Sequence, residues 1–121
     1  MSVKSYKELI VWQKAMDLVD EVYRLVKQLP VEERFALSDQ LRRAVVSIPS
    51  NIAEGQGRNT TRDFQNFLTM ARGSCFETET QLLICVRQKY LTQSQVGPAL
   101  NLCGEVGRML NALIGKLSTL H

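Results

Sequence analysis

The chain has 121 residues, of which 45% are hydrophobic and 22% are charged, which is the balance of an ordinary globular domain. Seven glycines and three prolines are too few for a fibrous or disordered chain. Fifteen basic and twelve acidic residues give a net charge of +3, which permits an anionic partner without requiring one. We therefore expect one domain, residues 1–121, large enough to bury its own core.

The cysteine and histidine pattern argues against metal binding and disulfide formation. Cys75, Cys85 and Cys103 have no CxxC spacing, and their odd number predicts buried, reduced thiols. The single histidine is His121, the last residue, so the chain offers neither a histidine-based triad nor a ligand cluster. No signal segment or long apolar run is present. We expect a cytoplasmic protein without metal, cofactor or membrane contact.

The first predicted helix runs from about Glu8 to Leu29 and carries two apolar stripes. One stripe contains Val11, Ala15, Leu18, Val22, Leu25 and Leu29. The other lies about 100° away around the helix and contains Trp12, Met16, Val19, Tyr23 and Val26. A helix in a monomeric bundle needs only one broad stripe. We therefore predict that Trp12, Met16, Val19 and Tyr23 contact another subunit.

The second predicted helix begins after the Leu29-Pro30 stop and a short turn. Its stripe contains Leu37, Leu41, Ala44, Ile48 and Ile52. Pro49 predicts either a kinked continuous helix, which we favour, or a stop followed by a restart capped by Asn51. The segment from Gly55 to Asn59 is the predicted break before the next helix.

The third predicted helix runs from about Thr61 to Tyr90, with Thr60 and Asp63 as a capping pair. Its apolar stripe contains Phe64, Leu68, Ala71, Cys75, Leu82 and Val86. A break near residues 91–94 precedes a fourth helix, with Pro98 in its first turn. Later apolar positions in that helix are Leu102, Val106, Met109, Leu113 and Leu117. Strand-like alternation is absent, so we predict an all-α, antiparallel up-down-up-down four-helix bundle.

Three segments carry a family resemblance. They are Glu8–Ala15, Ser47–Gly55, and Ala71–Ser74 followed by Glu77, Glu79, Thr80 and Gln81. In this order they resemble the four helix bundle protein, or 23S ribosomal RNA intervening-sequence protein, family over about residues 6–117. A related branch comprises the accessory variability proteins of diversity-generating retroelements. Two features depart from the pattern: Thr78 replaces a larger apolar residue, and the chain is only mildly basic.

The resemblance implies an antiparallel bundle that forms a ring-like homopentamer and has no catalytic role. In the retroelement branch, the pentamer is understood to bind nucleic acid and a reverse transcriptase. For this chain, the implied partners are therefore further copies of itself, RNA or DNA, and a protein such as a reverse transcriptase.

Polar residues within these segments predict a network between the second and third helices. Ser47, Asn51 and Glu54 fall on one flank of the second helix, while Arg72 and Glu79 share a flank of the third. With Glu77, they are expected to fix helix register through partly buried hydrogen bonds. The alternative is an active site that uses Glu54, Arg72, Glu77 and Glu79. We favour the structural role, because no partner nucleophile or metal motif accompanies the carboxylates.

Basic residues are expected to gather at the two ends of the bundle. One end collects Arg24, Lys27, Arg34, Arg87 and Lys89, and the other collects Lys4, Lys7, Arg58, Arg62 and Lys116. Arg42 and Arg43 are further candidates for contacting phosphates, although Arg43 has Asp39 four residues earlier as a possible ion-pair partner. In a ring, each charge recurs and the local field grows. The leading hypothesis is a non-catalytic, oligomeric scaffold that binds nucleic acid, and the alternative is a protein-interaction module.

Overall fold

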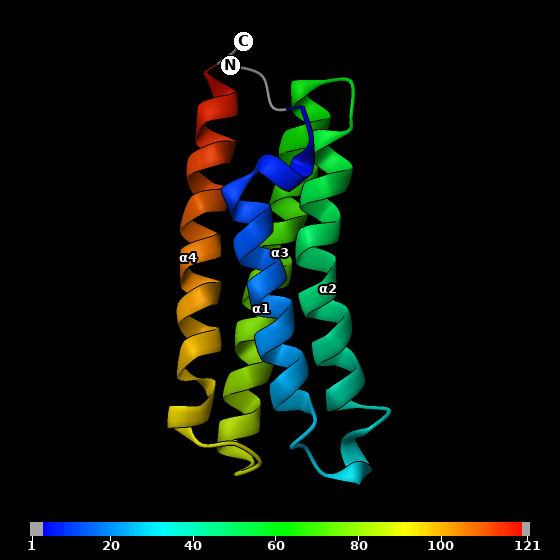
Figure 1. Cartoon of the computed structure of the whole chain (residues 1–121), viewed down its shortest axis with the longest axis vertical. Helices are drawn as coiled ribbons and strands as arrows, with labels where there is room; N and C mark the ends of the chain where they lie inside the picture. Colours follow the sequence, from blue (N-terminus) through cyan, green and yellow to red (C-terminus); the bar gives the residue numbers. More distant parts are fainter. Residues whose placement is uncertain (1–3, 120–121) are drawn as a thin grey trace.

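Residues 4–119 of the computed structural model form four long helices that run alternately up and down (Figure 1). Their bounds are Ile10–Val26 for α1, Leu37–Gln56 for α2, Thr61–Arg87 for α3 and Gln93–Ser118 for α4. Two 3₁₀ turns, η1 at Tyr6–Glu8 and η2 at Val31–Glu33, precede α1 and α2. The described segment contains no strand, and the predicted antiparallel four-helix bundle is confirmed.

The four helices are arranged as a square. α1 packs against α2 and α4, and α3 packs against the same two helices, while the diagonal pairs make no close backbone contact within residues 4–119. The surface formed by α1 and α2 therefore lies opposite the surface formed by α3 and α4. No helix in this part of the chain combines the length and apolarity needed to cross a bilayer. His121 lies outside the described residues.

One apolar core runs along the bundle axis and is built from the predicted stripes. Fully buried side chains from all four helices include Leu18, Leu41, Leu68, Leu82 and Leu110. Each such side chain stabilises the fold by roughly 1.5–3 kcal/mol relative to exposure. The three cysteines are free and buried, as predicted. Burial raises the pKa of the Cys75 and Cys103 thiols to about 12 and that of Cys85 to about 11.

Several helices begin or end a few residues away from the positions that the apolar pattern predicts, in part because capping residues determine where a helix starts. α1 ends at Val26, three residues before Leu29, and α3 ends at Arg87. α4 begins at Gln93, because Thr92 and Gln95 form a reciprocal capping box. Pro98 therefore lies inside α4 and not in its first turn. The predicted cap of α3 is present, since the Thr60 hydroxyl accepts from the Asp63 amide at 3.1 Å.

α2 continues through Pro49 to Gln56, so the alternative of a stop and restart is wrong. Gly55 was also expected to open a break, but it lies within α2 and is buried. A β-carbon built on Gly55 would come within 2.7 Å of the Phe67 Cβ and 3.0 Å of the Phe64 Cδ1. Gly55 is therefore required for the close approach of α2 and α3, and the break begins at Gly57.

Substitution of two glycines by alanine is expected to change stability in opposite directions. Gly55→Ala forces α2 and α3 apart at Phe67 and should lower the free energy of unfolding by about 1–3 kcal/mol. Gly73→Ala, in the exposed interior of α3 with nothing within 4 Å, should raise it by about 0.5–1 kcal/mol. Urea denaturation of both variants measures the difference. Equal stability of the two variants would contradict the close packing at Gly55.

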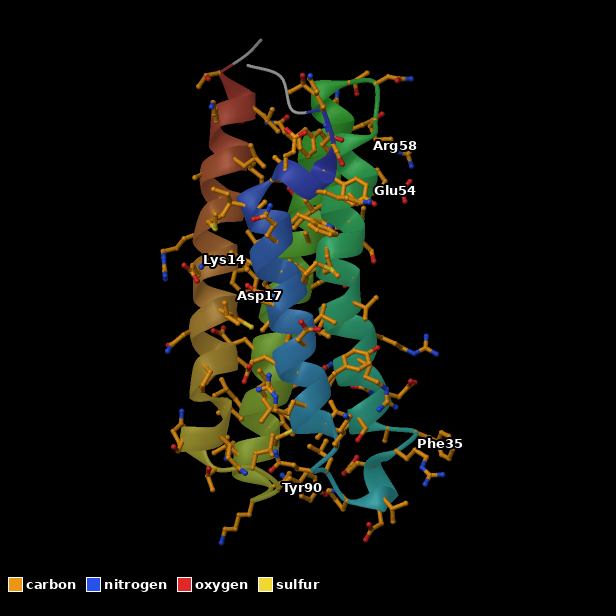
Figure 2. The ribbon with its side chains drawn as sticks, in the orientation of Figure 1. Lys14, Asp17, Phe35, Glu54, Arg58 and Tyr90 are labelled. Atoms are coloured by element: carbon orange, nitrogen blue, oxygen red, sulfur yellow. The ribbon has the colours of Figure 1, made fainter. Side chains whose placement is uncertain are left out.

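At the lower end of the bundle, a side-chain hydrogen bond connects the η2 segment to the α3–α4 connection. Tyr90 lies at this end (Figure 2). Its hydroxyl donates to Glu33 Oε2 at 2.9 Å, and Glu33 Oε1 accepts from the Leu37 amide at 3.2 Å. Lys89 precedes Tyr90 in the left-handed conformation, with φ 63°, and so turns the chain back after α3. The η2 segment is thus joined to both the start of α2 and the α3–α4 connection.

The Tyr90–Glu33 bond predicts a loss of stability at alkaline pH. The bond to Glu33, followed by desolvation, raises the pKa of Tyr90 in the folded protein. A raised pKa means that the stabilisation is complete below the unfolded-state pKa of about 10 and is lost as pH rises through the folded value. Tyr90→Phe should therefore be less stable than the parent protein at pH 8, and the difference should shrink above pH 10. Urea titrations at both pH values test this, and a pH-independent difference would contradict it.

Candidate functional site

An apolar groove lies on the surface between α1 and α2. Its walls are Trp12, Met16 and Val19 on α1 and Val46, Pro49 and Ala53 on α2, with Tyr6 at its upper end. The groove encloses about 340 Å³. Met16 and Val46 are each 39% exposed, and Tyr6 packs edge-on against Trp12 with ring centroids 5.2 Å apart. The second stripe of α1 is therefore only partly covered by α2.

A second hollow, of about 410 Å³, lies where α1 ends and α2 begins. We call it the basic cavity, because Lys27, Arg34 and Arg42 line it. The hydroxyl-bearing residues Tyr23 and Ser38 complete its polar lining. Lys27 and Arg34 are therefore brought together, as their shared end of the bundle predicts. Arg42 joins them from α2 and donates from Nη2 to the Arg34 carbonyl at 3.5 Å.

Several other predicted phosphate contacts are paired with carboxylates. Arg24 binds Glu21 at 2.7 Å. Arg58 binds Glu54 at 3.0 Å near the upper end of α2, and its guanidinium carbon lies 4.8 Å from the centroid of the Phe67 ring (Figure 2). Of the remaining predicted residues, Arg62, Arg87 and Lys89 are exposed and form no ion pair within residues 4–119.

Arg43 behaves as its sequence spacing indicates. It forms an ion pair with Asp39, four residues earlier on α2, at 3.0 Å. Arg42 points instead into the basic cavity. The two adjacent arginines therefore differ in their surroundings: one is neutralised by a carboxylate, and the other lies beside two more cations.

The predicted polar network between α2 and α3 is not assembled as expected. One side-chain bond joins the predicted flank to α3: the Ser47 hydroxyl donates to the Ser74 hydroxyl. Asn51 donates to the Ser47 carbonyl within α2 at 2.8 Å. Arg72 bonds to Asn111 of α4 at 2.8 Å, because it lies two residues, or about 200°, from Ser74 around α3.

The carboxylates proposed for an active site are also separated. Glu54 pairs with Arg58 on the surface, Glu77 is exposed, and Glu79 lines a small cavity of about 160 Å³ between α3 and α4. That cavity also contains Cys75 and Cys103. The raised pKa values keep both thiols protonated at neutral pH. Within residues 4–119, no group of three or more His, Cys, Asp or Glu side chains could hold a metal ion.

Sequence reasoning missed Phe35, which is 87% exposed just before α2. Phe35 belongs to none of the predicted apolar stripes, and it directly follows Arg34. This position outside the helical periodicity is the signal that could have identified it. The guanidinium carbon of Arg34 lies 5.7 Å from the centroid of the Phe35 ring, so this ring borders a residue of the basic cavity.

The chain was compared with known proteins. Residues 7–112 match the family model described as 23S rRNA-intervening sequence protein. One similar solved structure is a protein of unknown function from the S23 ribosomal protein family of Bacteroides thetaiotaomicron VPI-5482. It shares 30% identity, with a TM-score of 0.80 over 87% of this chain and 98% of that one. No functionally curated protein matches the sequence. With nearly the whole bundle inside the matched region, the chain belongs to the 23S rRNA-intervening sequence protein family.

Proposed function

We propose that the protein is a non-catalytic, self-associating helical scaffold that binds nucleic acid through basic residues at one end of the bundle. The observation that carries this proposal is the shared α1–α2 surface. An apolar groove runs along it and is followed, at the lower end, by a cavity with three cations that form no ion pair within residues 4–119.

Apolar side chains on opposite sides of the bundle support self-association. The α1–α2 groove is one such surface. On the opposite side, Phe76 is 59% exposed and Leu83 is 42% exposed, seven residues apart on α3. Contact between two different surfaces of neighbouring copies is heterologous and can close into a ring. A ring is the assembly that the sequence resemblance implies, and we propose a homopentamer on that ground.

The charge distribution supports a nucleic-acid partner. Lys27, Arg34 and Arg42 converge on one cavity, while Arg24, Arg43 and Arg58 are each held by a carboxylate. Glu33, in the same connection, forms no ion pair with these cations, and its two oxygens accept from Tyr90 and the Leu37 amide. In a ring, the unpaired cations recur around one rim, where phosphate binding would release counterions.

A second candidate is a scaffold that binds another protein and no nucleic acid. Its supporting observation is a further pair of exposed apolar residues on α3, Met70 at 47% and Ile84 at 39%. A surface of this kind that remains uncovered after assembly marks a protein contact. Under this alternative, a protein partner such as a reverse transcriptase would occupy the surface. The anisotropy assay described below distinguishes the two candidates, because only the nucleic-acid scaffold should bind the labelled oligonucleotide.

Placing a charge in the groove should disrupt the assembly without unfolding the subunit. Met16→Glu introduces a carboxylate at a position already 39% exposed, so the cost arises when a second copy covers it. Asn59→Glu adds the same charge at the exposed α2–α3 connection and serves as the control. Light scattering should give a smaller mass for Met16→Glu alone, with circular dichroism unchanged. An unchanged mass for both variants would show that the groove is not the subunit contact.

Nucleic-acid binding should weaken steeply with salt and depend on the basic cavity. Fluorescence anisotropy with a labelled oligonucleotide at several salt concentrations gives the slope of log K against log salt. Lys27→Gln should lower the affinity and reduce that slope by about 1 for each occupied cavity. Lys14→Gln is the control, since Lys14 is paired with Glu105 at 3.2 Å on the α1–α4 side. No binding at low salt would exclude the nucleic-acid role.

A further inference from the structure

The basic cavity is large enough to hold part of a small ligand. Its volume of about 410 Å³ falls within the range of roughly 300–1,000 Å³ typical of small-molecule sites. Its lining comes from the last turn of α1, the η2 connection and the first turns of α2. A cavity of this size accommodates a phosphate group together with part of the sugar that carries it.

The polar part of the lining suits a phosphate, while Val26, Leu29, Pro30 and Val31 form the apolar part. Lys27, Arg34 and Arg42 supply three positive charges, and Tyr23 and Ser38 supply hydroxyl groups. No carboxylate of residues 4–119 lies within 4.0 Å of the three cationic groups, although Glu32 lies in the same connection. Cations that line one cavity without an ion-pair partner repel one another, and an anion bound between them would relieve this repulsion. Arginine forms bidentate hydrogen bonds with phosphate oxygens.

An aromatic ring stands next to the cavity. Phe35 is 87% exposed, the highest fraction among the large apolar side chains of residues 4–119, and it points away from the bundle (Figure 2). One side of the ring faces the Arg34 guanidinium at 5.7 Å. Arg34 also lines the cavity, so the stacking surface and the phosphate pocket share one residue. Aromatic rings exposed beside a basic groove are platforms for unpaired bases.

We propose that Lys27, Arg34, Arg42 and Phe35 form a subsite for single-stranded nucleic acid, with a phosphate in the basic cavity and the adjoining base stacked on Phe35. This subsite rests on the nucleic-acid role proposed above and narrows the expected ligand to single-stranded nucleic acid. A base inside a duplex is already stacked on both of its faces and paired with a base of the other strand. Such a base cannot lie on Phe35 unless it leaves the helix, so a duplex can use only the phosphate contacts.

The test compares a labelled 12-nucleotide single strand with the duplex of the same sequence, using fluorescence anisotropy on the assembled protein. Phe35→Ala should weaken single-strand binding by about 5- to 150-fold, which corresponds to the loss of one stacking ring, and leave duplex binding unchanged. Phe35→Tyr should retain single-strand affinity. Because Phe35 is exposed, these variants are expected to fold normally.

The adjacent arginines provide a matched pair for the phosphate contact. Arg42→Gln should weaken binding of both strand forms and reduce the salt slope by about 1 per cavity, while Arg43→Gln, which removes the same charge from an ion pair with Asp39, should change little. Equal effects of the two substitutions would show diffuse electrostatics and overturn the subsite.

Other outcomes separate this inference from the broader function. Salt-sensitive binding that Phe35→Ala leaves unchanged would overturn the subsite while preserving the nucleic-acid role. A smaller assembly mass for Phe35→Ala by light scattering would assign the ring to contact with a second copy and also overturn the subsite. Failure of the parent protein to bind either strand form at low salt would overturn the broader function together with the subsite.

Discussion

A four-helix bundle buries one broad face of each helix, and α1 has more apolar surface than that face contains. Its first stripe, including Leu18 and Val22, is buried in the core. In the second stripe, Met16 is 39% and Tyr23 is 40% exposed, while Val26 at its lower end is buried. Because apolar surface exposed to water has a free-energy cost, this excess supports the proposed contact at the α1–α2 surface. The groove forms where the exposed part of this second stripe lies beside apolar residues of α2, such as Val46 and Pro49.

The same surface changes character at its lower end. Along the groove, neighbouring side chains are apolar, but at the junction of α1, η2 and α2 they become cationic and aromatic. The hydrogen bond between Tyr90 and Glu33 fixes η2, and with it Arg34 and Phe35, against the α3–α4 connection.

Much of the fold could be predicted from periodicity. The stripes containing Leu18, Leu41 and Leu68 specify buried faces, since spacing of three and four residues maps directly onto one side of a helix. The positions of the helix ends were predicted less accurately. In α4, for example, the capping box at Thr92 outweighs the preference of Pro98 for the first turn of a helix. Gly55 was taken for a helix stop, because sequence alone does not distinguish a terminating glycine from one that admits a neighbouring helix.

The candidate site was less predictable than the core, because it depends on which cations meet and which are already paired. Lys27 and Arg34 share one end of the bundle in any up-down topology, and they do lie together. Whether Arg42 or Arg43 joins them depends on a rotation of about 100° around α2, which helical spacing alone could not relate to the neighbouring connection. The network across α2 and α3 failed for a similar reason, since Arg72 and Ser74 project toward different helices.

The buried cysteines have a consequence for behaviour in changing redox conditions. Thiol–disulfide exchange proceeds through the thiolate, and a pKa of about 12 leaves roughly one thiol in 100,000 ionised at pH 7 for Cys75 and Cys103. Both sulfur atoms also lie inside the bundle, where glutathione-sized reagents cannot approach without local opening. Reaction of Cys75 or Cys103 with a glutathione-sized oxidant should therefore be slow in the folded subunit and should report local opening of the bundle.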